Sequence, residues 1–272
     1  MNEKEVKRFQ KKIYEAASPL RLLPWRWNDN SYEVVVSELM LQQTQVDRVL
    51  PKFKEFINHF PSFRALAEAS FDEVFVLWRG LGYNRRAQHL HNIAKLVIKE
   101  YDGELPSCKK ALRNLPGVGD YTAAAILVFA FQEPVAMIET NIRTAYCWSF
   151  FRGREGVSDS QILPIIEQTI DKADCRSWFY ALMDYGSKLK TLYRGIGQVS
   201  AHYKRQSKFI GSTRQARGQI LSLLSRSGPC KLQYLVAELG REPVEVVRII
   251  ESLEKEAFLV CDVHGRYTIN PG

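Results

Sequence analysis

The feature that most limits the fold is a glycine turn followed by a helix that is apolar on every side. Residues 115–119 read LPGVG, and residues 120–131 read DYTAAAILVFAF, with no charged side chain after Asp120. Because a helix that is apolar all round must be covered on every face, we expect it at the centre of a helical core. The apolar run then stops, and one carboxylate, Glu139, follows it.

Apolar residues recur at helical spacing through the first two hundred residues, whereas short strands are hard to find before residue 255. We take Asp72 and Ser158 as N-caps of two of these helices. The pattern predicts an all-α architecture for this part of the chain. The predicted helices are 3–17, 32–60, 62–69, 71–81, 85–101, 108–115, 120–131, 140–151, 158–170 and 175–190.

The pattern changes at about Thr213. Three short helices are predicted at 214–228, 232–240 and 243–259, and a hairpin at 259–269 turns at His264-Gly265. This order of elements is typical of a winged helix. Such modules usually bind DNA, and many instead contact protein, so both partners stay open at this point.

The composition indicates a globular protein with a polyanionic partner or simply a soluble surface. The chain has 272 residues, 46% of them hydrophobic, and a formal net charge of +8. No apolar run is long enough to span a bilayer, and the polar start MNEKEVKRFQKK is not a signal peptide, so we expect a cytoplasmic protein, nucleoid-associated if bacterial. Five isolated cysteines without a C-x-x-C pair argue against disulfides and against a local metal site.

Positive charge is concentrated between the two parts of the chain. This stretch is rich in glycine and poor in acids, so it reads as a linker or as a strip that faces phosphates. Its cations are Lys188, Lys190, Arg194, Lys204, Arg205, Lys208, Arg214 and Arg217.

The glycine turn and a second acid point to chemistry. Gly117 and Gly119 can turn the chain tightly and aim backbone N–H groups at a phosphate, although LPGVG alone also fits an ordinary helical hairpin. Glu38 lies inside the apolar pattern VVVSELMLQQT. An ionised carboxylate is costly to bury without a partner or a function, so Glu38 is either a functional acid or an exposed one.

Four segments resemble successive motifs of the helix-hairpin-helix DNA glycosylases, most closely the MutY-type adenine DNA glycosylases. They are LPWR (23–26), VSELMLQQTQV (36–46), GLGYNRRAQHL (80–90) and LPGVGDYTAAAIL (115–127). The resemblance implies an all-α, two-lobed fold and a nucleotide flipped out of duplex DNA. We expect a six-helix barrel lobe at 30–135, a second lobe from 1–29 plus 136–210, and a winged-helix-like α+β module at 213–272.

The resemblance also implies roles for individual residues. Glu38 matches the acid that protonates the departing base, Gln42, Gln43 and Tyr83 match a wedge in the minor groove, and the hairpin 115–119 grips phosphate, with room for a monovalent cation. The implied catalytic residues are Glu38, Glu139, Tyr121 and Asn141; the DNA-binding residues are Gln42, Gln43, Thr44, Tyr83, Arg85, Gly117, Val118, Gly119, Lys204 and Arg205; the base pocket comprises Trp25, Arg26 and Tyr180.

Departures from the family pattern refine this expectation. Tyr121 stands where bifunctional relatives such as endonuclease III carry a lysine nucleophile, and a phenol cannot form a Schiff base. Glu139 replaces the family's usual aspartate. The segment after ALMDYG (181–186) lacks the four cysteines of an iron–sulfur cluster, so no cofactor is expected. Tyr180 replaces a Glu or Gln that reads adenine, and a winged helix replaces the Nudix-like domain.

The sequence therefore favours a monofunctional DNA glycosylase of base excision repair without lyase activity, acting as a monomer on double-stranded DNA with a mismatched or damaged base. Adenine opposite 8-oxoguanine or guanine is the leading substrate, and thymine, uracil or another lesion is the alternative on the same scaffold. A non-catalytic DNA-binding regulator stays open because of Glu139. The cysteine spacing argues against an iron–sulfur carrier.

Overall fold

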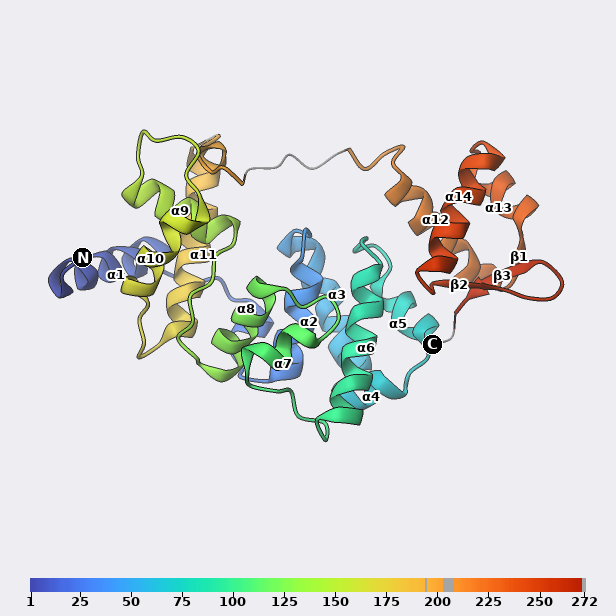
Figure 1. Cartoon of the computed structure of the whole chain (residues 1–272), viewed down its shortest axis with the longest axis horizontal. Helices are drawn as coiled ribbons and strands as arrows, with labels where there is room; N and C mark the ends of the chain where they lie inside the picture. The colour runs from blue at the N-terminus through green and yellow to red at the C-terminus, as the bar shows by residue number, and fades with distance from the viewer. Residues whose placement is uncertain (194, 203–207, 271–272) are drawn as a thin grey trace. The chain divides into compact units, whose positions relative to one another are not determined.

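The computed structural model describes residues 1–193, 195–202 and 208–270, which form helices and one small sheet (Figure 1). The first part of the chain contains α1 (Glu3–Ala17), η1 (Pro24–Arg26), α2 (Ser31–Leu41), α3 (Val46–His59), α4 (Phe63–Glu68), α5 (Phe71–Trp78), α6 (Arg85–Glu100), α7 (Lys109–Asn114), α8 (Asp120–Phe131), α9 (Thr140–Phe150), α10 (Asp159–Thr169), α11 (Cys175–Leu192) and η2 (Ile196–Val199). The second part contains α12 (Thr213–Ser227), β1 (Cys230–Lys231), α13 (Leu232–Leu239), α14 (Pro243–Lys255), β2 (Leu259–Cys261) and β3 (Arg266–Ile269). The predominantly helical prediction is confirmed.

The chain forms two compact units, each made of two separate stretches. The first unit comprises Met1–Glu38 and Leu105–Arg205, and the second comprises Leu39–Glu104 and Gln206–Gly272. Helix α2 therefore contributes to both, since the boundary falls after Glu38. The lobe boundaries expected from the resemblance, at 30, 136 and 213, stay a prediction.

In the first unit, α11 packs against α9 and α1, and Figure 1 shows α9, α10 and α11 beside α1. The aromatic ring of Phe9 on α1 contacts Tyr146 and Trp178 edge to face, at centroid distances of 5.6 and 5.8 Å. Helix α8 lies in the same unit, and its residues 122–129 are all buried, as its apolar sequence predicts. The helix that the sequence places at the centre of a core therefore lies in one.

The C-terminal module has the winged-helix order. The sheet has the strand order β1-β3-β2 with antiparallel pairing, in which Cys230 faces Tyr267 and Leu259 faces Ile269. Helices α12 and α14 pack together and bury Ile220, among others. The predicted hairpin is confirmed, and Gly265 has a φ of 70°, which suits glycine at the turn.

Two local predictions are wrong. The segment 32–60 is not one helix, because the chain turns between α2 and α3, where Gln43 has a φ of 55°. Asp72 is not an N-cap: Ser70 caps α5 in a capping box with Glu73, whereas Ser158 does cap α10 as predicted. Strand β1 precedes residue 255 but has only two residues, too few to show an alternating pattern.

Candidate active site

Glu38 is buried among apolar residues on α2. Val35, Val36 and Leu39 are fully buried around it, and Glu38 itself is 7% exposed, so the exposed alternative is wrong. Burial raises the pKa of this carboxyl, a hydrogen bond with Tyr121 and the charge of Arg26 lower it, and the nearby Glu139 carboxylate raises it, so that the pKa lies at about 7. Glu38 can therefore hold a proton near neutral pH.

Tyr121 lies in the first turn of α8, one residue after the helix begins, and its hydroxyl shares a hydrogen bond with the Glu38 carboxyl. Burial and the charges of Glu38 and Glu139 raise the pKa of the phenol well above its usual value. Tyr121 is thus a neutral hydrogen-bond donor at physiological pH. The structure brings these three predicted catalytic residues to one place in the first unit.

Glu139 is the N-cap of α9. Its Oε1 accepts hydrogen bonds from the backbone N–H groups of Asn141 and Ile142, at 2.7 and 2.8 Å. Burial raises the pKa of this carboxyl, and the two N–H groups, followed by the charges of Lys190 and Arg143, counteract that shift. The helix terminus and the nearby cations thus favour the ionised form.

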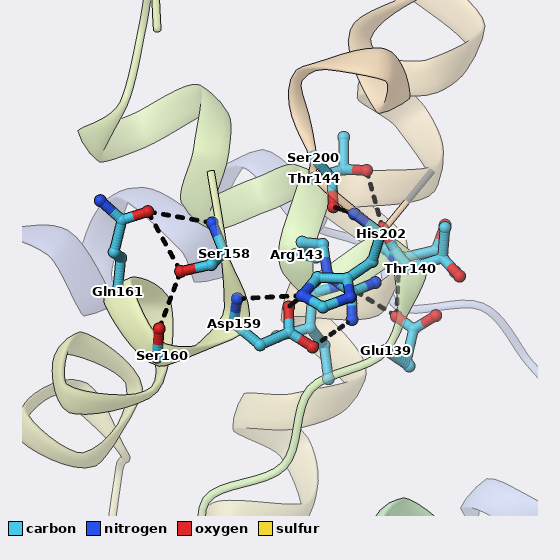
Figure 2. A network of polar contacts seen from close by, with 12 residues as sticks. Glu139, Thr140, Arg143, Thr144, Ser158, Asp159, Ser160, Gln161, Ser200 and His202 are labelled. Carbon is cyan, nitrogen blue, oxygen red and sulfur yellow. Dashed lines mark hydrogen bonds and ion pairs between the residues drawn. The ribbon is translucent and has the colours of Figure 1, made fainter. Parts of the chain in front are cut away.

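A network of ion pairs and hydrogen bonds extends from α9 to the segment after α11 (Figure 2). Arg143 forms a bidentate pair with Asp159, at 2.6 and 2.8 Å, and the ring of His202 lies 3.7 Å from the same carboxylate. Backbone hydrogen bonds of Val157 with Val199 and Ala201 add to these contacts. In this way the cysteine-free segment after α11 is joined to Val157 by backbone hydrogen bonds and to the start of α10 through His202 and Asp159.

The predicted base-pocket residues Trp25, Arg26 and Tyr180 lie together and are buried. The guanidinium carbon of Arg26 is 4.5 Å from the centre of the Tyr180 ring, and Phe129 stacks on that ring at 4.3 Å. The Tyr180 hydroxyl donates to the carbonyl of Trp25 at 3.5 Å. Tyr180 is only 6% exposed, so it forms a packed wall and offers little free surface to a base.

The glycine hairpin forms as a tight turn. Val118 N–H donates to the Leu115 carbonyl at 3.2 Å, and Gly117 has a φ of 75°, which favours glycine. Gly119 instead has a φ of −87° and is the N-cap of α8, so its conformation does not require glycine. A Cβ atom there would meet nothing within 4 Å. A role of this turn in gripping phosphate or a cation stays a prediction.

Arg86, which the sequence reasoning missed, organises the segment that carries the predicted wedge. This buried side chain on α6 donates to the carbonyls of Leu39 and Met40 at 2.9 and 2.7 Å, and also to the carbonyl of Gln42. Burial lowers the pKa of its guanidinium to about 10. Arg86 thus caps the end of α2 and fixes the turn in which Gln42 and Gln43 lie.

The same guanidinium also holds the second predicted wedge segment. Arg86 donates to the carbonyl of Gly82 at 3.0 Å and to Thr44 Oγ1 at 3.0 Å, and its carbon lies 5.4 Å from the Tyr83 ring. Tyr83 itself has a φ of 48°, an uncommon conformation for a bulky residue. Arg86 therefore contacts the predicted wedge residues Gln42 and Tyr83, and also Thr44, another predicted DNA-binding residue.

The winged helix packs on the second unit's other helices through specific contacts. Glu256 forms ion pairs with Arg85 on α6 and Arg217 on α12, both at 2.7 Å, and Phe258 packs on Phe71 at 5.9 Å. Arg85, predicted to bind DNA, is thus engaged in this contact. Arg214 donates to the hydroxyl of Tyr83. Lys204 and Arg205 lie outside the described residues.

The described ranges contain neither a metal-binding group nor a membrane-spanning helix. There, His, Cys, Asp and Glu side chains form no group of three or more that could hold a metal ion. None of the helices there has the length and apolarity needed to cross a bilayer.

Comparison with known proteins fits this arrangement. The model of the HhH-GPD superfamily of base excision DNA repair proteins matches residues 36–170. An adenine DNA glycosylase of Mycolicibacterium smegmatis is 30% identical over 268 residues, which cover 92% of this chain and 91% of that relative. The chain belongs to this superfamily. The resemblance seen in the sequence is confirmed.

Other known proteins are similar over smaller shares of this chain. An adenine DNA glycosylase of Mus musculus is 33% identical over 76% of this chain and 42% of its own length. The structure of a thermostable thymine-DNA glycosylase matches with a TM-score of 0.61 and 25% identity, over 74% of this chain and 97% of that one. A non-covalent endonuclease III–DNA complex, at 18% identity and a TM-score of 0.56, covers 67% of this chain and 85% of that one and shows the shared fold.

Proposed function

We propose that the chain is a monofunctional DNA glycosylase that hydrolyses the bond between an adenine and its deoxyribose in double-stranded DNA. The proposal rests on one observation above all: the buried Glu38 carboxyl, with a pKa of about 7, lies in the same unit as the N-terminal end of α9, where Glu139 is held. A proton donor and a carboxylate are the two groups that cleavage of a glycosidic bond needs.

Glu38 is the general acid in this proposal. Its carboxyl donates a proton to the departing base, which leaves more readily as a neutral species, and the resulting carboxylate then accepts a proton from the attacking water. Tyr121 keeps the carboxyl in place through its hydrogen bond and remains neutral itself. The raised pKa matters because a glutamic acid with the usual pKa is almost fully ionised at neutral pH and cannot donate a proton.

Glu139 stabilises the sugar. Positive charge develops on the deoxyribose as the base leaves, and a carboxylate fixed beside it in a pocket with little water lowers the barrier. One oxygen of Glu139 accepts hydrogen bonds from the backbone N–H groups of Asn141 and Ile142, which orients the carboxylate.

The reaction ends, in this proposal, at an intact abasic site. Tyr121 offers no amine for a Schiff base, so strand cleavage requires added hot alkali. Borohydride should trap no covalent complex. If it does, the Lys190→Arg variant decides whether the Lys190 amine is the nucleophile, since this amine lies near Glu139.

Adenine is proposed as the target base because several relatives that match most of this chain are adenine DNA glycosylases. Thymine is the second candidate, since a thymine-DNA glycosylase is a structural neighbour at 25% identity. The pocket wall is consistent with either base, because Tyr180 is packed by Phe129 and Arg26 and presents no free amide or carboxylate to adenine.

A panel of duplexes tests the activity and the base together. Each duplex carries one lesion or mismatch: adenine opposite 8-oxoguanine, adenine opposite guanine, thymine opposite guanine, or uracil opposite guanine. After incubation with enzyme, hot alkali reveals abasic sites. We expect cleavage for adenine opposite 8-oxoguanine or guanine. Cleavage only at thymine or uracil would support the second candidate, and tight binding without any excision would support a regulator.

We also propose that the enzyme acts as a monomer without a cofactor. The hydrogen bonds that join Val157 and Asp159 to Val199, Ala201 and His202 support the absence of a cofactor, because they fix the cysteine-free segment after α11 without a cluster. Purified protein should contain no stoichiometric iron, and chelators should leave its thermal unfolding unchanged. A stoichiometric iron signal with visible absorbance would contradict this.

A further inference from the structure

Lys190, near the end of α11, is bound to a predicted catalytic residue. Its ammonium group donates to the side-chain carbonyl of Asn141 at 2.8 Å, and the side chain is partly buried. Lys188, two residues earlier, is exposed and donates to the backbone carbonyl of Ala16 instead. An ammonium group that has lost part of its water needs such a partner. The two lysines, which the sequence groups in one basic strip, thus have different environments.

Helix α11 holds Asn141 at a second point. A Cβ atom on Gly186 would lie 2.0 Å from the backbone carbonyl oxygen of Asn141, so only glycine allows this approach. Gly186 and Lys190 are four residues apart and lie on the same face of the helix. This face therefore presses on the backbone of Asn141 and binds its side chain.

The position of Asn141 determines the position of Glu139. The Asn141 backbone N–H donates to Glu139 Oε1 at 2.7 Å, the shorter of the two hydrogen bonds that hold this oxygen. The second nearby cation, Arg143, is paired with Asp159, and this carboxylate offsets its charge. Lys190 is bound to a neutral amide, so its charge acts on Glu139 without such an offset.

We propose that Lys190 is a positioning residue for the proposed glycosylase reaction: it fixes Asn141 from α11 and keeps the Glu139 carboxylate charged in its partly buried site. The inference rests on the proposed function for its rate measurements, but the underlying contact is a property of the folded chain. It explains how a glutamate can serve where the family pattern has an aspartate. The longer side chain of Glu139 is held at the N-terminus of α9 by Asn141, and Asn141 is fixed by its contacts with α11.

The sign of the expected pH effect follows from the groups that face Glu139. Burial raises the pKa of its carboxyl, whereas Lys190 and Arg143 lower it. Its charge in turn raises the pKa values of Glu38 and Tyr121. Removing the Lys190 charge should therefore raise the pKa of Glu139. Because Glu139 acts as a carboxylate, the acid side of the pH–rate profile should move to higher pH.

The test compares three variants of the full chain in single-turnover excision across pH 4.5 to 9. Lys190→Met removes the charge and the hydrogen bond but keeps the length of the side chain, Lys190→Arg keeps both, and Lys188→Met is the matched control. For Lys190→Met we expect the acid limb to move up by about one pH unit, the lower end of the range for losing a nearby opposite charge. At pH values well below the limb, the rate should drop about tenfold. Lys190→Arg and Lys188→Met should retain the wild-type limb.

A second readout separates this inference from the proposed function. The pKa of Glu139 is measured by NMR of the carboxyl carbon in protein labelled with ¹³C-glutamate, with Glu139→Gln to assign the signal. A higher pKa in Lys190→Met than in wild type and Lys188→Met supports the inference even if no duplex is cleaved, in which case only the proposed function fails. An unchanged pKa and an unchanged acid limb in folded Lys190→Met would overturn the inference.

Discussion

Arg26 and Asp184 form a bidentate ion pair in the interior of the first unit, with Nη1–Oδ2 and Nη2–Oδ1 distances of 2.8 and 3.0 Å. Their side chains are 6% and 7% exposed. Asp184 also accepts the backbone N–H of Arg21 at 2.9 Å. The pair thus joins α11 to the segment around η1 that contains Trp25, and it fixes the guanidinium of Arg26 over the Tyr180 ring.

Asp184→Asn should destabilise the protein by about 3–5 kcal/mol, because it leaves the Arg26 charge buried without a counter-ion. Urea unfolding at neutral pH measures the change. The double variant Arg26→Met/Asp184→Leu should recover part of the loss, since it removes both charges. A loss for the single variant no larger than that for Arg64→Met, which removes an exposed pair, would contradict a stabilising role of this contact.

Tyr121→Phe should move the basic limb of the excision profile to higher pH. The hydrogen bond from Tyr121 lowers the pKa of Glu38, so its removal lets Glu38 keep its proton as the pH rises above 7. Glu38 and Glu139 interact, so each limb of the pH–rate profile reports the titration of the pair and not of one residue alone. Single-turnover rates from pH 5 to 9 measure the shift. Tyr14→Phe, which removes a hydroxyl bonded to Asp171, is the control. A limb that moves to lower pH in Tyr121→Phe would show that the sign is wrong.

Arg86→Lys should cost more than about 2 kcal/mol of stability, because an ammonium group cannot serve the carbonyls of Leu39, Met40 and Gly82 at once. The turn that carries Gln42 should loosen as well, which weakens binding to a duplex with a lesion more than binding to an intact duplex. Chemical unfolding and fluorescence anisotropy measure the two effects. Equal affinities for the lesion duplex in variant and wild type would rule out this role in orienting the wedge.

Lys204→Gln/Arg205→Gln should weaken binding to every duplex alike and reduce the slope of log K against log salt by roughly one unit for each phosphate that the variant no longer neutralises. The measurement is affinity for undamaged and mismatched duplexes between low and moderate salt. A double variant of Lys4 and Lys12 on α1 controls for the change in net charge. Unchanged slope and affinity would show that this basic strip does not face phosphate.

The helices and the winged-helix order could be predicted because they depend on local sequence patterns. The apolar run 120–131 and the hairpin around Gly265 are read directly from spacing and turn residues. The break between α2 and α3 could not be predicted, since the apolar stripe continues through it from Leu39 to Val46. The turn depends on the positive φ of Gln43 and on Arg86, which is distant in sequence.

In the candidate site, too, the residues that stand out from their local sequence could be predicted, whereas those whose roles depend on distant partners could not. Glu38 stands out because a carboxylate inside an apolar helix is costly, and the structure shows it buried. Arg86 and Lys190 do not stand out, because each is one of several cations in its segment. Their roles arise from partners 46 or 47 and 49 positions away along the chain. The sequence instead led to Arg85 as a predicted DNA-binding residue, and in the structure Arg85 forms an ion pair with Glu256.

The single-turnover excision rates of Glu38→Gln and Glu139→Gln, measured beside duplex affinity, test the central claim most directly. Glu38→Gln keeps the shape of the side chain and loses the proton, so excision should fall by at least about 10²–10⁴-fold while affinity for the duplex stays near that of wild type. The excision rate of Glu139→Gln should fall by a comparable factor, and Glu139→Asp should keep measurable excision activity. If Glu38→Gln removes the base as fast as the wild-type protein does, the assignment of Glu38 as the acid is contradicted.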